Sequence, residues 1–139
     1  MKNLYDLPCD IAKTLNIIGD KWTLLIIRQL MLGNNTFTQI QGKLDGIASN
    51  LLSDRLKCLE RDGLITSQLY QPHPPRYRYM LTEQGMDLSD VLNSIMLWGE
   101  KHLKECHKQL THSKCGHTIE LAYYCPGCEK IISKEDIKF

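Results

Sequence analysis

Apolar residues recur at helical spacing near the start of the chain. Within residues 10–18 they occupy the i, i+4 and i+7 positions, which share one face of a helix. Asp20 follows, a residue type that caps helix N-termini, and an apolar run covers residues 21–31. The pattern predicts an amphipathic helix over 10–18 and a more apolar helix that begins just after Asp20.

A shorter helix is expected after the turn that Gly33 forms with the two asparagines behind it. This helix covers residues 37–44, and either Thr36 or Thr38 supplies its N-cap. A second turn, at residues 45–46, closes the segment.

The most strongly helical segment opens at Ser49. Its leucines recur at i, i+4 and i+7, as Leu52, Leu56 and Leu59, and Gly63 stands where a C-cap glycine belongs. The leucines predict a buried face, so the polar side chains of this helix are expected on its open side.

The period of the pattern changes after Gly63. Residues 64–70 and 76–81 are rich in β-branched and aromatic residues, and a proline-rich loop separates them. They predict a two-stranded hairpin. Thr82 then heads the longest predicted helix, whose apolar positions reach Trp98 and cover a wider surface than one small core needs.

The composition indicates a soluble globular protein of 139 residues, with 42% hydrophobic and 24% charged residues. Near residues 108–112 the helical periodicity stops and Cys, His and Gly become frequent. We therefore expect one domain over residues 1–108 and a small tail over residues 109–139. The predicted fold class is mainly α with a small β-hairpin (α+β).

No signal peptide or membrane-spanning stretch is evident, because the first residues lack an apolar core and the longest apolar run is short. A cytoplasmic location is expected, where thiols stay reduced. The six cysteines therefore favour metal binding or redox sensing over a disulfide framework.

Two helices joined by a tight turn and followed by a hairpin are typical of a winged helix-turn-helix. The second helix of this motif enters the major groove of DNA, and the hairpin forms a wing that reaches phosphates. Net charge is only +1, so the pattern carries this prediction. The candidate DNA contacts are Thr38, Ser49, Asn50, Ser53, Arg55, Lys57, His73, Arg76 and Arg78. The alternative is a solvated helix face beside an ordinary hairpin.

Several motifs of the chain together resemble the HxlR-type transcriptional regulators, winged-helix proteins related in fold to the MarR group. They are "GDKW" before an apolar helix, "LSDRLKCLERDGLI", "YMLTEQG" and "WGEKH", within about residues 7–105. The resemblance implies a homodimer built from the N-terminal helices and the long C-terminal helix. It also implies a palindromic operator and regulation of nearby genes, for which we expect repression.

Cys9 lies just before the first predicted helix, where several HxlR-type regulators carry a cysteine that senses oxidants or electrophiles. A helix N-terminus favours a thiolate, although Asp10 beside it works against this. The resemblance therefore implies an oxidant or small-molecule inducer acting at Cys9. The alternative is a small buried apolar residue. Cys58 is expected to be partly buried packing, and Cys106 has no evident partner.

The tail carries "HSKCGH" at residues 112–117 and "CPGC" at residues 125–128. Pairs of ligands with two residues between them are typical of a zinc ribbon. Thiolates together with an imidazole suit zinc. The expected ligands are Cys115, Cys125, Cys128 and one histidine. Spacing favours His112, and His117 is the rival.

One structural zinc per chain is expected at this site, because protein ligands would fill all four positions. The alternatives are free thiols in a poorly ordered tail and a disulfide that forms between the last two cysteines on oxidation. Catalytic thiol chemistry is disfavoured, since the pattern lacks the βαβ context of such motifs.

The sequence thus predicts a DNA-binding regulator and no enzyme, because no paired carboxylates, Ser-His-Asp set or phosphate-binding loop appears in a supporting context. Two other classes compete with this reading. One is a metal-dependent redox or electron-transfer protein that uses the tail cysteines. The other is a protein–protein adaptor whose winged helix binds a protein partner.

Overall fold

The computed structural model describes residues 4–105 and 108–139. The chain divides into two compact units, Met1–Ser89 and Asp90–Phe139. Among the described residues, no helix is both long and apolar enough to cross a membrane. In chain order the elements are α1 (Asp10–Ile18), α2 (Thr23–Met31), α3 (Phe37–Lys43), α4 (Ser49–Arg61), β1 (Ile65–Gln71), β2 (Arg76–Leu81), α5 (Glu83–Met86), α6 (Leu88–His102), β3 (Tyr123–Cys125), β4 (Lys130–Ile132) and the short 3₁₀ helix η1 (Lys134–Asp136).

The first unit has one apolar core between its helices and its hairpin. The leucine stripe predicted for the helix that opens at Ser49 is buried in α4, which packs against α3 and β1. The largest fully buried side chains are Ile26, Ile27, Ile40, Leu52, Leu56, Leu59 and Ile65. Burying such side chains contributes roughly 1.5–3 kcal/mol each, which makes this core the main stabilising term of the unit.

Local capping residues set the ends of the two central helices. Thr36, and not Thr38, caps α3: its side chain accepts a bond from the Gln39 backbone, and the Gln39 side chain bonds back to the cap. Gly63 ends α4 at φ 78°, with the backbone N–H of Leu64 donating to the Leu59 carbonyl at 2.9 Å. The predicted C-cap glycine is thereby confirmed.

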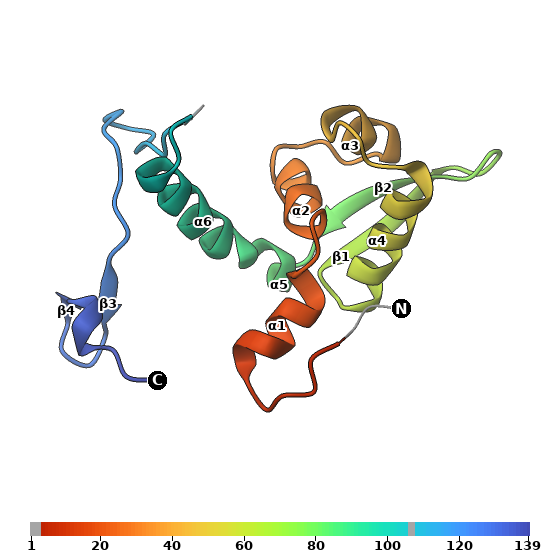
Figure 1. Ribbon diagram of the computed structural model, residues 1–139. Coiled ribbons are helices and arrows are strands. Elements are labelled where there is room, and N and C mark those ends of the chain that lie inside the picture. The colour runs from red at the N-terminus through yellow and green to blue at the C-terminus, as the bar shows by residue number, and fades with distance from the viewer. Residues whose placement is uncertain (1–3, 106–107) are drawn as a thin grey trace. The chain divides into compact units, whose positions relative to one another are not determined.

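The predicted hairpin is confirmed as the antiparallel pair β1–β2, which runs from Ile65 opposite Leu81 to Gln71 opposite Arg76. Figure 1 shows its loop end projecting beyond α3 and α4. A further contact was not predicted from the sequence: the Tyr79 backbone N–H donates to the Asn35 carbonyl at 2.8 Å. This hydrogen bond holds β2 against the turn before α3, so the position of the hairpin relative to α3 is fixed.

The helix predicted to start at Thr82 is interrupted. Thr82 caps only the four residues of α5, and α6 begins separately at Leu88. The backbone of α5 lies close to the residue that follows α4, because a Cβ on Gly85 would lie 2.1 Å from the Leu64 carbonyl oxygen. Thr82 also donates from its backbone N–H to Leu64 and from its hydroxyl to Gly63. These bonds tie Thr82, the N-cap of α5, to the residues that follow α4. The next helix, α6, begins at Leu88.

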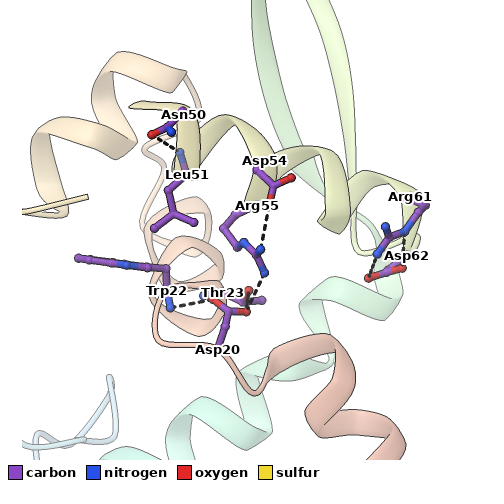
Figure 2. A network of polar contacts seen from close by, with 9 residues as sticks. All are labelled: Asp20, Trp22, Thr23, Asn50, Leu51, Asp54, Arg55, Arg61 and Asp62. Atoms are coloured by element: carbon purple, nitrogen blue, oxygen red, sulfur yellow. Dashed lines mark hydrogen bonds and ion pairs between the residues drawn. The ribbon is translucent and has the colours of Figure 1, made fainter. Parts of the chain in front are cut away.

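An acidic residue between α1 and α2 organises the start of α2 and reaches α4 (Figure 2). Oδ1 of Asp20 accepts bonds from the backbone N–H groups of Trp22 and Thr23, at 2.9 and 3.1 Å, and the Thr23 hydroxyl donates to Oδ2. The N-cap of α2 is Trp22 and not Asp20 as predicted, because α2 begins two residues later than expected, at Thr23; Asp20 still accepts bonds from the backbone N–H groups of both residues. Nη1 of Arg55 lies 3.5 Å from Oδ2 of the same carboxylate.

Replacing Arg55 with Gln is expected to lower the free energy of unfolding by about 1–3 kcal/mol, since it removes the guanidinium that lies beside the half-buried Asp20 carboxylate. The measurement is urea unfolding followed by circular dichroism. Lys57→Gln is the matched control, because Lys57 is exposed on the same helix. That variant should stay within about 0.5 kcal/mol of wild type. Equal losses in the two variants would show that the Asp20 contact does not stabilise the fold.

Candidate nucleic-acid interface and tail cysteines

The first turns of α4 present small polar side chains and one cation away from the core. Ser49, Asn50 and Lys57 are exposed and Ser53 is half-buried, while the leucine stripe on the other side is fully buried. In a helix-turn-helix this end of the second helix faces base edges. Asn50 lies in the first turn, where its side-chain oxygen accepts a bond from the Leu51 backbone at 3.0 Å.

Arg55, predicted as a DNA contact, is placed differently from the other candidates. Only 11% of its side chain is exposed, and its guanidinium lies between Asp20 and Asp54, at 3.5 and 2.8 Å (Figure 2). The structure therefore gives Arg55 a role inside the protein, where it sets the position of α4. Sequence spacing carries no signal for such a contact between distant segments.

Gln41 was missed in the sequence and joins the two helices of the motif. Its Nε2 donates to the Ser49 hydroxyl at 2.7 Å, from α3 to the first residue of α4. Thr38, the predicted candidate on α3, is exposed. A single polar residue on an exposed helix face gives no sign in the sequence that it bonds to the next helix.

The wing places its predicted candidates together on the exposed surface of the hairpin. His73, Arg76 and Arg78 are all exposed. The guanidinium of Arg78 lies over the Tyr70 ring, 5.2 Å from its centroid, which holds the cation against the hairpin by a cation–π contact. The exposed Tyr77 lies between the two arginines in sequence and was not among the predicted contacts.

A shallow hollow of ≈260 Å³ separates α4 from the wing. Its floor includes a side-chain bond, in which the Ser67 hydroxyl donates to Glu60 at 2.6 Å. Burial raises the pKa of Tyr79 above its usual value, and the charges of Glu60 and Tyr77 raise it further. This phenol therefore stays neutral and polar. The lining residues are Ser53, Leu56, Lys57, Glu60, Ser67, Tyr77 and Tyr79.

The cations of this region divide into two groups. Arg55 and Arg61 belong to ion pairs of the fold, the latter with Asp62 at 3.2 Å, which also raises the pKa of Arg61. Within residues 4–105 and 108–139, no ion pair is found for Lys57, Arg76 or Arg78. In this region, the positive charge that remains for an anionic partner therefore lies on the exposed side of α4 and on the wing.

Cys9 lies at the position predicted for a sensor cysteine. It is exposed, it occupies the N-cap of α1, and its carbonyl accepts the Lys13 backbone N–H at 3.0 Å. The alternative of a buried Cys9 is not what the structure shows. Cys58 is half-buried in α4 as expected, and Cys106 lies outside the described residues.

The tail brings the expected metal ligands together in two pairs. Nδ1 of His112 lies 3.1 Å from the Cys115 sulfur. Cys125 accepts bonds from the backbone N–H groups of Cys128 and Gly127 and from the Cys128 side chain, and these bonds lower its pKa below the usual thiol value. In the part of the chain that the structure describes, no three His, Cys, Asp or Glu side chains gather around one point. The two pairs are therefore separate.

Comparison with known proteins gives the same reading as the geometry of the first unit. The model of the family described as "HxlR-like helix-turn-helix" matches residues 17–107. An uncharacterized HTH-type transcriptional regulator of Mycobacterium bovis is 32% identical over 130 residues, which are 91% of this chain and 82% of the relative.

Two solved structures share the fold. The crystal structure of PA1607 has a TM-score of 0.81 and 29% identity, covering 96% of this chain and 95% of that one. The redox regulator HypR in its oxidized form has a TM-score of 0.63 and 29% identity, covering 70% of this chain and 100% of that one. With a helix-turn-helix, a wing and these matches, the chain belongs to the HxlR-like helix-turn-helix family of DNA-binding transcriptional regulators.

Proposed function

We propose that this regulator is a homodimeric repressor that binds a palindromic operator in double-stranded DNA. The observation that carries the proposal is the exposed polar first turn of α4, which the buried leucines and the Arg55–Asp20 pair hold in place beside a cationic wing. Major-groove readout needs a helix whose exposed end carries hydrogen-bonding side chains, and phosphate binding needs cations close to it.

The proposed contacts divide by chemistry. Asn50 suits adenine, since its amide both donates and accepts, and Ser49 and Ser53 suit base edges or phosphates. Lys57 and the wing cations suit phosphates, which carry no sequence information themselves. Arg55 is left out, because its guanidinium is engaged with Asp20 and Asp54.

The proposed dimer rests on apolar helix faces that remain exposed in a single chain. In α1, Ile11 is 64% exposed beside Leu15 at an apolar hollow. In α6, Ile95 and Trp98 are 50% and 60% exposed. Exposed apolar side chains at helical spacing mark interaction surfaces, and a second copy with the same faces would cover them. A two-fold dimer matches the symmetry of a palindrome.

Repression and redox control complete the proposal. A dimer bound across a promoter excludes the transcription machinery, which makes repression the direct consequence of binding. HypR is a redox regulator, and the exposed Cys9 of this chain adjoins α1, the helix proposed to form the dimer boundary. An oxidant such as peroxide transfers one oxygen atom to the Cys9 thiolate, which leaves sulfenic acid and hydroxide. The added polar group would shift the two subunits and release DNA.

The proposal also includes a cytoplasmic location and no catalytic role. The known relatives are transcriptional regulators, which act by binding DNA. The family match and the transcriptional regulators among the relatives favour this reading over the electron-transfer and adaptor readings.

Two substitutions on α4 are expected to weaken DNA binding in different ways. The probe is a duplex selected by the wild-type chain from a random library. Asn50→Ala should cost about 1–3 kcal/mol on this duplex and relax the preference at one base pair. Lys57→Gln should weaken binding to all sequences alike and lower the slope of log affinity against log salt by about 1.

Arg61→Gln is the control for these variants, because Arg61 is exposed at the far end of α4 and pairs with Asp62. Its affinity should equal that of wild type in fluorescence anisotropy. If Asn50→Ala bound the selected duplex as tightly as wild type, α4 would not read bases through this residue.

Cys9→Ser is expected to abolish oxidant-induced release of DNA. Wild-type protein treated with peroxide should lose affinity for the selected duplex by about 5–150-fold, the usual range for coupling between two sites. The Ser variant should bind equally well with and without peroxide, and Cys58→Ser should respond as wild type does. A Cys9→Ser protein that still released DNA on oxidation would place the sensor elsewhere.

A further inference from the structure

Two turns in the tail share one backbone layout. The first covers residues 112–117 and the second covers residues 125–130. In the first, the backbone N–H of His112 donates to the His117 carbonyl at 2.9 Å. In the second, Cys125 pairs with Lys130 where β3 meets β4. In both turns, therefore, the first residue is paired with the sixth.

The fifth residue of each turn adopts a left-handed backbone conformation. It is Gly116 at φ 75° in the first turn and Glu129 at φ 53° in the second. Glu129 is the only residue other than glycine with positive φ in the part of the chain that the structure describes. Residues with a side chain rarely adopt this conformation. Its presence in both turns shows that the two segments fold to the same local shape.

The first and fourth residues of each turn carry atoms that bind metal ions. In the first turn, Nδ1 of His112 and the Cys115 sulfur are 3.1 Å apart. In the second, the Cys125 sulfur lies close to the backbone of its own turn. A Cβ built on Gly127 would lie 3.8 Å from that sulfur, so the turn wraps closely around it. Each turn thus presents a pair of side-chain ligands on a bonded frame.

The equivalence of the turns decides between the two histidines. His112 occupies the position of Cys125, the first ligand of its turn. His117 occupies the position of Lys130, which pairs with the first residue and carries no soft ligand. The ligand set is therefore His112, Cys115, Cys125 and Cys128, which is a combination that tetrahedral zinc takes up.

Each chain holds these pairs apart. Among the described residues no three potential ligands gather, and residues 119–122, which lead into β3, belong to no helix or strand and run as an extended trace in Figure 1. The second hairpin also leaves apolar side chains uncovered, with Tyr124 62% and Ile131 69% exposed. An extended arm with exposed apolar side chains is the usual form of a segment exchanged between two copies of a chain.

We propose that the two turns are halves of zinc sites shared between two copies of the chain, with His112 and Cys115 of one copy and Cys125 and Cys128 of the other. A dimer then holds two such sites. Each binding event converts three thiols to thiolates and releases their protons to solvent, and the imidazole binds in its neutral form. The proposal rests on the homodimer proposed above, but it does not depend on DNA binding.

The test uses two full-length variants that carry different affinity tags. One lacks the first turn's ligands (His112→Ala with Cys115→Ser), and the other lacks the second turn's ligands (Cys125→Ser with Cys128→Ser). Each is purified alone, and mixed dimers are purified from co-expression by both tags in succession. Zinc and protein are quantified by elemental and amino-acid analysis, with wild type and His117→Ala as references.

Wild type and His117→Ala should hold about one zinc per chain, and each variant alone should hold less than about a tenth of that. The mixed dimer should hold about one zinc per two chains, because one of its two shared sites keeps all four ligands. A site within one chain gives a mixed dimer without zinc, since each copy then lacks one half. That result overturns the proposal, as does a wild-type chain without zinc or a failure to recover mixed dimers. Loss of DNA binding with normal zinc counts would overturn only the proposed function.

Discussion

The ion pair between Arg55 and Asp20 fixes α4, the second helix of the helix-turn-helix. Asp20 holds the first turn of α2 through two backbone N–H groups and the Thr23 hydroxyl, and it reaches across to the guanidinium of α4. The leucines on the next face of α4 enter the core. Polar contact and apolar burial together leave one orientation for the helix, with Asn50 and Lys57 outward. The wing is held against the same group of helices, because the backbone of β2 hydrogen-bonds to the turn before α3.

Most of the first unit could be predicted from the sequence, because its signals are local. The spacing of Leu52, Leu56 and Leu59, the Gly63 cap and the proline-rich hairpin loop each depend on neighbouring residues. Two features that the sequence did not predict lie where distant segments meet. Arg55 turns inward to a carboxylate between α1 and α2, and the helix after Thr82 breaks where Gly85 touches the Leu64 carbonyl.

The tail is stabilised by different interactions from those of the first unit. It has no apolar core of comparable size, and its order comes from backbone bonds in two small hairpins. The sequence was enough to predict two ligand pairs, since their spacing is local. Its spacing favours His112, three residues before Cys115, but it leaves His117, two residues after Cys115, as a rival. The matching turns favour His112, because it stands in its turn where Cys125 stands in the other.

The central claim is that α4 and the wing of each subunit read one half of a two-fold operator. Hydroxyl-radical footprinting of the full chain on its selected duplex tests this most directly. The account predicts two equal protected regions whose centres lie about 10 base pairs, or a multiple of one helical turn, apart, with protection of the flanking backbone by the wing. A single unsymmetrical protected region, or no protection at saturating protein, would contradict it.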